Sequence, residues 1–241
     1  MLSNLFNDFL NNLLPVQCTL CSTILPSTRF RAPSQLFCAD CQAHLPRWLA
    51  ADSCPQCARP GTYGLHCGEC MRRAPAFDQT IALYLFVEPI KALIHAAKFG
   101  AQWQILGNLA QFESLLAQLK QADWIIPMPL HANRLKERGF NQAGEIAQPL
   151  SRASAIPIRH DVLARIRDTE HQARLSAKAR WKNLRRAFAC QCDCTGKTIL
   201  LVDDVMTSGA SLHAAAKVLK AAGAARIINV VLARTPSQPY P

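Results

Sequence analysis

The chain has 241 residues, 50% of which are hydrophobic, and its formal net charge at pH 7 is +11. This length suffices for one domain of ordinary size and a smaller one, and the composition is that of a folded rather than a disordered protein. No apolar run approaches the roughly 20 residues that a membrane-spanning helix needs. Residues 1–15 also lack the basic start and the cleavage site of a secretory signal. We therefore expect a cytoplasmic protein without a membrane span.

The N-terminal segment has leucine and phenylalanine at helical spacing up to residue 14, and Pro15 ends the pattern. We expect a short helix that packs on the protein itself. A surface for a partner or for the edge of a membrane is the alternative.

Eight of the 11 cysteines form four CxxC pairs between residues 18 and 70. Each CxxC turns two sulfurs toward one point, and two such pairs complete the tetrahedral four-thiolate site of a structural zinc ion. Sequential pairing would give a double zinc ribbon; interleaved pairing and the loss of metal from one site stay open. The segment has few apolar residues in periodic array, so metal binding would be part of its folding energy. The expected ligands are Cys18, Cys21, Cys38, Cys41, Cys54, Cys57, Cys67 and Cys70.

After Pro75 the pattern changes to alternating strands and helices. We expect strands over residues 81–87, 124–129, 197–203 and 225–233. The expected helices cover residues 89–99, 104–120, 141–152, 175–188 and 210–222, and Pro149 should bend the third helix or end it early. This alternation predicts an α/β fold with a mainly parallel sheet and helices on both faces. The predicted domains are thus an N-terminal helix with a double zinc ribbon over 1–77, and the α/β domain over 78–241.

The motif ILLVDDVMTSGAS, residues 199–211, is the most informative segment. Asp203 and Asp204 come at the end of an apolar strand, where carboxylates suit the hydroxyls of a sugar. The next residues run into a helix, whose first amides carry partial positive charge and bind anions. The segment therefore predicts a site for a phosphorylated ribose. Gly209 lets the backbone approach a phosphate closely, and Thr207, Ser208 and Ser211 add hydroxyl donors.

This motif resembles the phosphoribosyl-pyrophosphate (PRPP) fingerprint of type I phosphoribosyltransferases. Together with the cysteine-rich start and PMPLHANRLKERGFNQA at 127–143, it makes the chain similar to ComF-family proteins, which are associated with DNA uptake in competence. The resemblance implies that Asp203 and Asp204 bind the ribose hydroxyls of PRPP and that Mg²⁺ accompanies it. It also implies that the pyrophosphate loop consists of Met128, Pro129 and Leu130. The 5′-phosphate ligands that it implies are Thr207, Ser208, Gly209, Ala210 and Ser211.

Basic residues elsewhere in the chain are candidate phosphate or DNA ligands. Residues 81–241 hold 21 of the 27 Lys and Arg residues, and such a concentration attracts phosphates. Solvated basic surface is the alternative for each of them. Trp181, in a segment that resembles the family's basic flexible segment, is available for base stacking. The candidates are Lys98, Arg134, Arg138, Arg174, Lys178 and Arg180.

The function expected from this resemblance is PRPP or ribose-phosphate binding in DNA uptake, with contacts to single-stranded DNA and a helicase-type competence partner. The alternative is an active phosphoribosyltransferase, which transfers ribose phosphate from PRPP to an unidentified acceptor. Relatives that salvage 6-oxopurines carry an acid where this chain has Thr207, which argues against hypoxanthine–guanine salvage. No general base can be named. A third alternative is a scaffold with a vestigial site.

Overall fold

The computed structural model describes residues 16–25, 36–100, 102–168, 184 and 186–236. The chain forms two compact units, Met1–Leu45 and Pro46–Pro241. This division into compact units precedes the second group of cysteines, and the domain boundary expected after residue 77 stays a prediction. The physical reason is that Cys54, Cys57, Cys67 and Cys70 share a hydrophobic core with strands and a helix of the larger unit.

The smaller unit has little regular structure among its described residues. A bridge between Gln17 and Ile24 closes the first cysteine turn. Helix α2 (Ala39–Ala43) follows, and the sulfur of its N-cap residue Cys38 accepts a hydrogen bond from the Cys41 amide. The helix predicted up to residue 14 lies outside the described residues.

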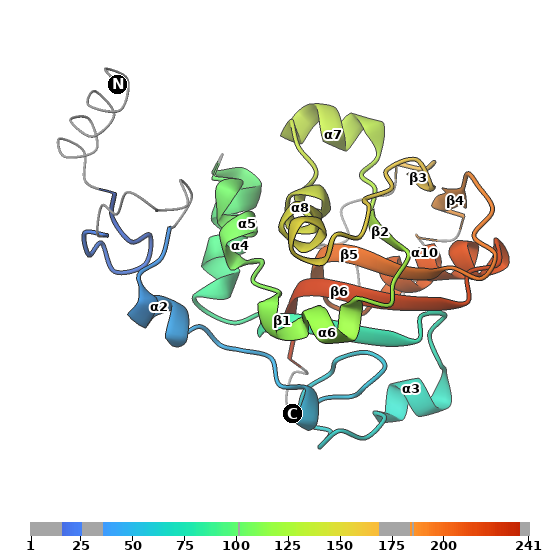
Figure 1. The fold of residues 1–241 in the computed structure, drawn as a ribbon, viewed down its shortest axis with the longest axis horizontal. Helices are drawn as coiled ribbons and strands as arrows, with labels where there is room; N and C mark the ends of the chain where they lie inside the picture. The colour runs from blue at the N-terminus through green and yellow to red at the C-terminus, as the bar shows by residue number, and fades with distance from the viewer. Residues whose placement is uncertain (1–15, 26–35, 101, 169–183, 185, 237–241) are drawn as a thin grey trace. The chain divides into compact units, whose positions relative to one another are not determined.

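The larger unit is built on a four-stranded parallel sheet in the order β1-β6-β5-β2 (Figure 1). Leu201 of β5 lies opposite Asn229 of β6 on one side and Ile126 of β2 on the other. The four predicted strands are thus confirmed, although β5 continues past residue 203 and includes both aspartates. The strands are β1 (Gln79–Leu85), β2 (Trp124–Pro127), β5 (Thr198–Met206) and β6 (Arg226–Arg234).

Helices cover both faces of this sheet. Ile199 and Leu201 share a core with residues of α10 (Ala210–Ala221). Because side chains alternate along a strand, Leu200 and Val202 face the other side. There α8 (Gln142–Ser154) packs on β5 and β2, and α5 (Gln104–Leu109) packs on α8. The predicted α/β class with two helical layers is therefore correct.

The remaining elements connect this framework. A short antiparallel pair, β3 (Leu163–Arg165) and β4 (Phe188–Cys190), lies next to α10. No pattern in the sequence predicted this pair of strands. The other elements are 3₁₀ turns at Ala50–Asp52 and Glu113–Leu115 and the helices α3 (Gly68–Arg72), α4 (Ile90–Phe99), α6 (Leu116–Leu119) and α7 (Ala132–Arg138).

Three predicted helices differ from the structure. The helix expected over 104–120 breaks after Leu109, whose carbonyl oxygen accepts a hydrogen bond from the buried Tyr84 hydroxyl at 3.0 Å instead of continuing the helix. α8 does not end early at Pro149, because buried Ile146 and Leu150 hold it against the sheet on both sides of the proline. Most of the helix expected over 175–188 lies outside the described residues, but its last residue, Phe188, begins β4.

Candidate functional site

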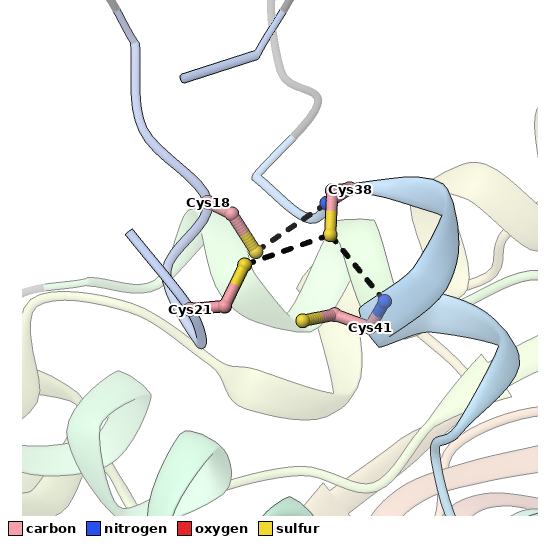
Figure 2. A group of neighbouring side chains, drawn as sticks. All are labelled: Cys18, Cys21, Cys38 and Cys41. Carbon is pink, nitrogen blue, oxygen red and sulfur yellow. Dashed lines mark hydrogen bonds between the residues drawn. The ribbon is translucent and has the colours of Figure 1, made fainter. Parts of the chain in front are cut away.

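The first cysteine cluster consists of Cys18, Cys21, Cys38 and Cys41 (Figure 2). Their sulfur atoms all lie within 4.8 Å of one another, and those of Cys21 and Cys38 are 3.7 Å apart. Zinc–sulfur bonds of about 2.3 Å in a tetrahedron require sulfur–sulfur distances of roughly 3.8 Å. The Cys38 amide donates to the Cys18 sulfur, as amides commonly do toward thiolates. The cluster therefore fits a four-thiolate zinc ion.

The second cysteine cluster consists of Cys54, Cys57, Cys67 and Cys70, and all four residues are buried. The sulfurs of Cys57 and Cys67 are 3.5 Å apart. A hydrogen bond from Cys70, helped by the charge of a nearby arginine, lowers the pKa of Cys57 to about 4, so this sulfur is ready to bind metal as a thiolate. Of the pairings that the sequence left open, the structure has the sequential one in both clusters.

A pocket of about 360 Å³ opens at the carboxyl ends of the parallel strands. Such a position is where α/β sheets bind their ligands. Lys98, Arg134 and Arg138 line it, whereas Arg174, Lys178 and Arg180 lie outside the described residues. The pocket also contains all ten residues that the sequence assigned to PRPP: Met128, Pro129, Leu130, Asp203, Asp204, Thr207, Ser208, Gly209, Ala210 and Ser211. The structure brings these residues together, and their individual roles stay predictions.

The loop between β5 and α10 has the geometry of an anion site. Gly209 is the N-cap residue of α10 and has a φ of 74°, which a residue with a side chain rarely adopts. A Cβ atom there would come within 2.6 Å of the Met206 methyl carbon. Ser208 accepts a hydrogen bond from the Ala210 amide through its hydroxyl oxygen. The first amides of a helix of this length, together with two serine hydroxyls, suit a phosphate group.

The two aspartates lie on β5 at the floor of this pocket. The Lys98 ammonium, from the last turn of α4, is 2.6 Å from an oxygen of Asp204, which is 9% exposed. Burial, together with repulsion from Asp204, raises the pKa of Asp203 to about 7. Two adjacent carboxyl groups in a confined pocket are costly to ionise together. A ligand that donates hydroxyl hydrogens to them, and brings a cation, would favour the ionised pair.

The basic side chains of the pocket come from separate segments. Arg134 and Arg138 lie on α7, and Arg138 donates a hydrogen bond to Gln142 at the start of α8. Asn141 caps α8 and donates through its amide to the carbonyl oxygen of Met128 at 3.1 Å. The segment RGFNQ thus fixes the loop after β2 as well as presenting an arginine.

Arg165 is a pocket residue that the sequence analysis missed. It ends the short strand β3, and its charge is close enough to Asp203 for the two groups to influence each other's pKa. Burial lowers the pKa of this guanidinium group, and Asp203 opposes that shift. An isolated arginine in a three-residue strand gives no sequence signal, because only the pairing of β3 with β4 brings it to the pocket.

Comparisons with known proteins agree with this architecture. Residues 136–241 match the phosphoribosyl transferase domain family, and residues 9–71 match the double zinc ribbon domain family. Competence protein F of Haemophilus influenzae is 34% identical over 82% of this chain and 90% of its own length. The chain belongs to the ComF family. It carries a double zinc ribbon with two structural zinc sites and a phosphoribosyltransferase-like domain, as the sequence predicted.

Other members of the ComF family are similarly related. DNA utilization protein YhgH of Escherichia coli (strain K12) is 35% identical over 76% of this chain and 84% of its own length. Competence protein ComFC of Bacillus subtilis is 28% identical over 82% of this chain and 83% of its own length. Among the described residues, no helix has the length and apolar character needed to cross a bilayer.

Proposed function

We propose that this protein binds PRPP, or a closely related ribose phosphate, with Mg²⁺ in the pocket at the carboxyl ends of β2 and β5. One observation carries the proposal: the acidic pair, the anion-binding loop before α10 and the basic residues of separate segments line the same pocket. PRPP has a phosphate at one end of its ribose and a pyrophosphate at the other. Its hydroxyls need acceptors and its phosphates need amides and cations, and the lining of this pocket includes groups of all three kinds.

Within this proposal, Asp203 and Asp204 accept hydrogen bonds from the ribose hydroxyls. The loop over 207–211 binds the 5′-phosphate. The segment 128–130, with Arg134, Arg138 and Lys98 nearby, holds the pyrophosphate, whose charge Mg²⁺ offsets. Arg165 is a further cation beside Asp203.

Isothermal titration calorimetry with Mg-PRPP tests this proposal. We expect one site per chain in the wild type, and a loss of affinity of about 100-fold or more in Asp203→Asn and Asp204→Asn, because each loses a charged acceptor. Asp161→Asn is the matched control, since Asp161 is an exposed aspartate paired with Arg159 outside the pocket. No heat of binding in the wild type, or equal binding in all three variants, would reject the proposal and favour a scaffold with a vestigial site.

We further propose that the protein acts in DNA uptake or utilisation and contacts single-stranded DNA through its basic segments. The names of its relatives, which refer to competence and to DNA utilization, support the first part. The placement of 21 of the 27 Lys and Arg residues in 81–241 supports the second. A helicase-type partner stays an implication of the family resemblance.

Electrophoretic shift assays with single-stranded DNA at several salt concentrations test the DNA contact. Replacing Arg174, Lys178 and Arg180 with alanine should lower the affinity and reduce the salt slope by about 2, since each phosphate contact on a single strand contributes about 0.7. A triple alanine variant of Lys120, Arg152 and Lys217, which are exposed and outside the pocket, removes the same charge as a control. Equal effects of the two triple variants would mean that the DNA senses net charge alone.

An active phosphoribosyltransferase is the second candidate. The observation that favours it is the set of cations beside the acidic pair, because a leaving pyrophosphate needs electrostatic stabilisation. Pyrophosphate release from Mg-PRPP with a panel of nucleobases is the test. Turnover no faster than in a double Asp203→Asn, Asp204→Asn variant would leave ligand binding as the function of the site.

A further inference from the structure

Arg234 is a buried arginine to which neither the fold nor the ligand site assigns a role. It is the last residue of β6, lies opposite Met206 of β5, and is 4% exposed. Its guanidinium donates hydrogen bonds in two directions. Nε donates to the carbonyl oxygen of Cys57 at 2.8 Å, and Nη1 donates to those of Met206 at 3.0 Å and Thr207 at 2.7 Å. One side chain thus joins a zinc-ligand segment to the last residue of β5 and the first residue of the loop over 207–211.

The second cysteine cluster also supplies the negative charge that this arginine needs. A buried guanidinium is costly unless an opposite charge compensates it, and no carboxylate forms an ion pair with Arg234 among the described residues. A zinc ion with four thiolates retains a net negative charge, and it also fixes the turn that contains the Cys57 carbonyl group to which Arg234 donates.

Packing connects the same two regions independently of Arg234. Phe77 and the four cysteines of the second cluster belong to one hydrophobic core with Met206 and Ala210. The space beside Gly209 is bounded by Met206 and by the ring of Phe77. The amide of Ala76 donates a hydrogen bond to the His213 ring on α10 at 3.0 Å. The segment that follows the second cluster therefore contacts both the loop and the helix that the loop begins.

We propose that Arg234 is a positioning residue through which the metal of the second cysteine cluster sets the conformation of the loop over 206–211. Loading of that metal then controls the affinity of the pocket for its ribose-phosphate ligand, an inference that rests on the function proposed above. The zinc-thiolate centre holds the guanidinium in place, and the guanidinium holds the carbonyl groups of Met206 and Thr207. Without the metal, the Cys57 carbonyl group is no longer held in place, and Arg234 loses the anchor through which it positions the loop.

The first experiment substitutes Arg234. Arg234→Met keeps an apolar chain of similar length, and Arg234→Lys keeps the charge but not the fork of donors. We expect Arg234→Met to lower the affinity for Mg-PRPP at least about tenfold, and Arg234→Lys to restore part of it, while both variants keep two zinc ions per chain. Arg226→Met is the control, because Arg226 is the exposed first residue of the same strand. Equal affinities of Arg234→Met and Arg226→Met would overturn the proposal.

The second experiment removes the metal itself. A Cys21→Ser background disrupts the first cluster, so that a zinc-selective chelator acts on the second ion, and added zinc reverses the treatment. We expect zinc removal to speed hydrogen exchange over 206–211 and to lower the Mg-PRPP affinity at least about tenfold. Exchange over α8, on the other face of the sheet, should stay unchanged.

The outcomes separate this inference from the proposed function. Unchanged exchange over 206–211 after zinc removal would overturn the coupling, and so would faster exchange throughout the sheet, which would make the zinc a general determinant of the fold. If the zinc-loaded wild type does not bind Mg-PRPP, the proposed ligand is wrong. The exchange of the loop with and without zinc still decides whether metal and loop are coupled.

Discussion

The two cysteine clusters have the same ligand set and very different surroundings. In the first, only Cys18 is buried and Cys21 is exposed, whereas all four residues of the second are buried. The first belongs to the unit Met1–Leu45, and the second belongs to the unit that carries the ligand pocket. The same zinc-binding motif therefore serves two purposes. The first holds a small segment together, and the second shares a hydrophobic core with residues on either side of the loop that we propose binds phosphate.

The largest difference between the clusters should appear in stability. Cys57→Ser should lower the free energy of unfolding of the larger unit by more than about 4 kcal/mol, since structural zinc contributes directly to folding and the serine hydroxyl is left buried. Cys21→Ser should leave that unit unchanged. All four tryptophans lie beyond residue 45, so tryptophan fluorescence during guanidinium unfolding reports on the larger unit alone. Equal guanidinium unfolding midpoints for Cys57→Ser and Cys21→Ser would contradict the proposed difference between the two clusters.

A matched pair of phenylalanines tests the same comparison without touching a metal ligand. Phe37 and Phe77 are each 2% exposed, one in each unit. Phe77→Ala should destabilise the larger unit by about 3–5 kcal/mol, because it leaves a cavity between the second cluster and the ligand loop. Phe37→Ala should not shift the tryptophan transition. A shift of similar size would show that the two units unfold together.

The pH dependence of Mg-PRPP binding tests the ionisation of the acidic pair in the pocket. Since Asp203 has a pKa raised to about 7, it loses its ability to accept two hydroxyl hydrogens as the pH falls below 7. The affinity for Mg-PRPP should fall more steeply between pH 8 and pH 6 in the wild type than in Asp203→Asn. The variant has no carboxyl at this position, so its pH dependence measures the titration of the ligand itself.

The raised pKa of Asp203 also makes folding stability depend on pH. Ionisation of this carboxyl favours ligand binding but disfavours folding. A carboxyl whose pKa is higher in the folded state than in the unfolded state favours folding when protonated. Ionisation of Asp203 therefore costs stability as the pH rises from about 4 to 7. Asp203→Asn should raise the unfolding temperature of the ligand-free chain at pH 8 and not at pH 4. An equal effect at both values would contradict the assignment.

The smallest expected effect concerns two glycines with the same backbone conformation. Gly209 and Gly196 have φ angles of 74° and 73°, but no atom would lie within 4 Å of a Cβ at Gly196. Each Gly→Ala change should cost about 1 kcal/mol of stability through the strained backbone, and Gly209→Ala should cost more because Met206 must also shift. Only Gly209→Ala should also weaken Mg-PRPP binding in calorimetry. Equal binding by both would mean that the loop does not contact the phosphate.

The sequence predicts the parts of this molecule whose signals are local. The CxxC spacing identifies both ligand sets, because the metal geometry is encoded within each turn. The run ILLVDDVMTSGAS identifies the strand, the acidic pair and the helix start in one continuous segment. The parallel sheet follows from the alternation of strands with helices.

What the sequence does not predict depends on contacts between distant segments. At the break after Leu109, the carbonyl oxygen of this residue accepts a hydrogen bond from the hydroxyl of Tyr84, which lies in another element. Strand pairing places two of the arginines. Arg165 is placed by the pairing of β3 with β4, and Arg234 by the pairing of β6 with β5. The inclusion of the second cysteine cluster in the larger unit follows from shared packing with Met206 and Phe77, and no composition change marks it.

The most direct test of the central claim is a crystal structure of the zinc-loaded chain with Mg-PRPP. Our account predicts the 5′-phosphate at the amides of 207–211, the ribose hydroxyls on Asp203 and Asp204, and the pyrophosphate beside 128–130, with Arg234 still bridging Cys57 and Thr207. Ligand density elsewhere on the protein, or a pocket that stays without density at saturating ligand, would contradict it.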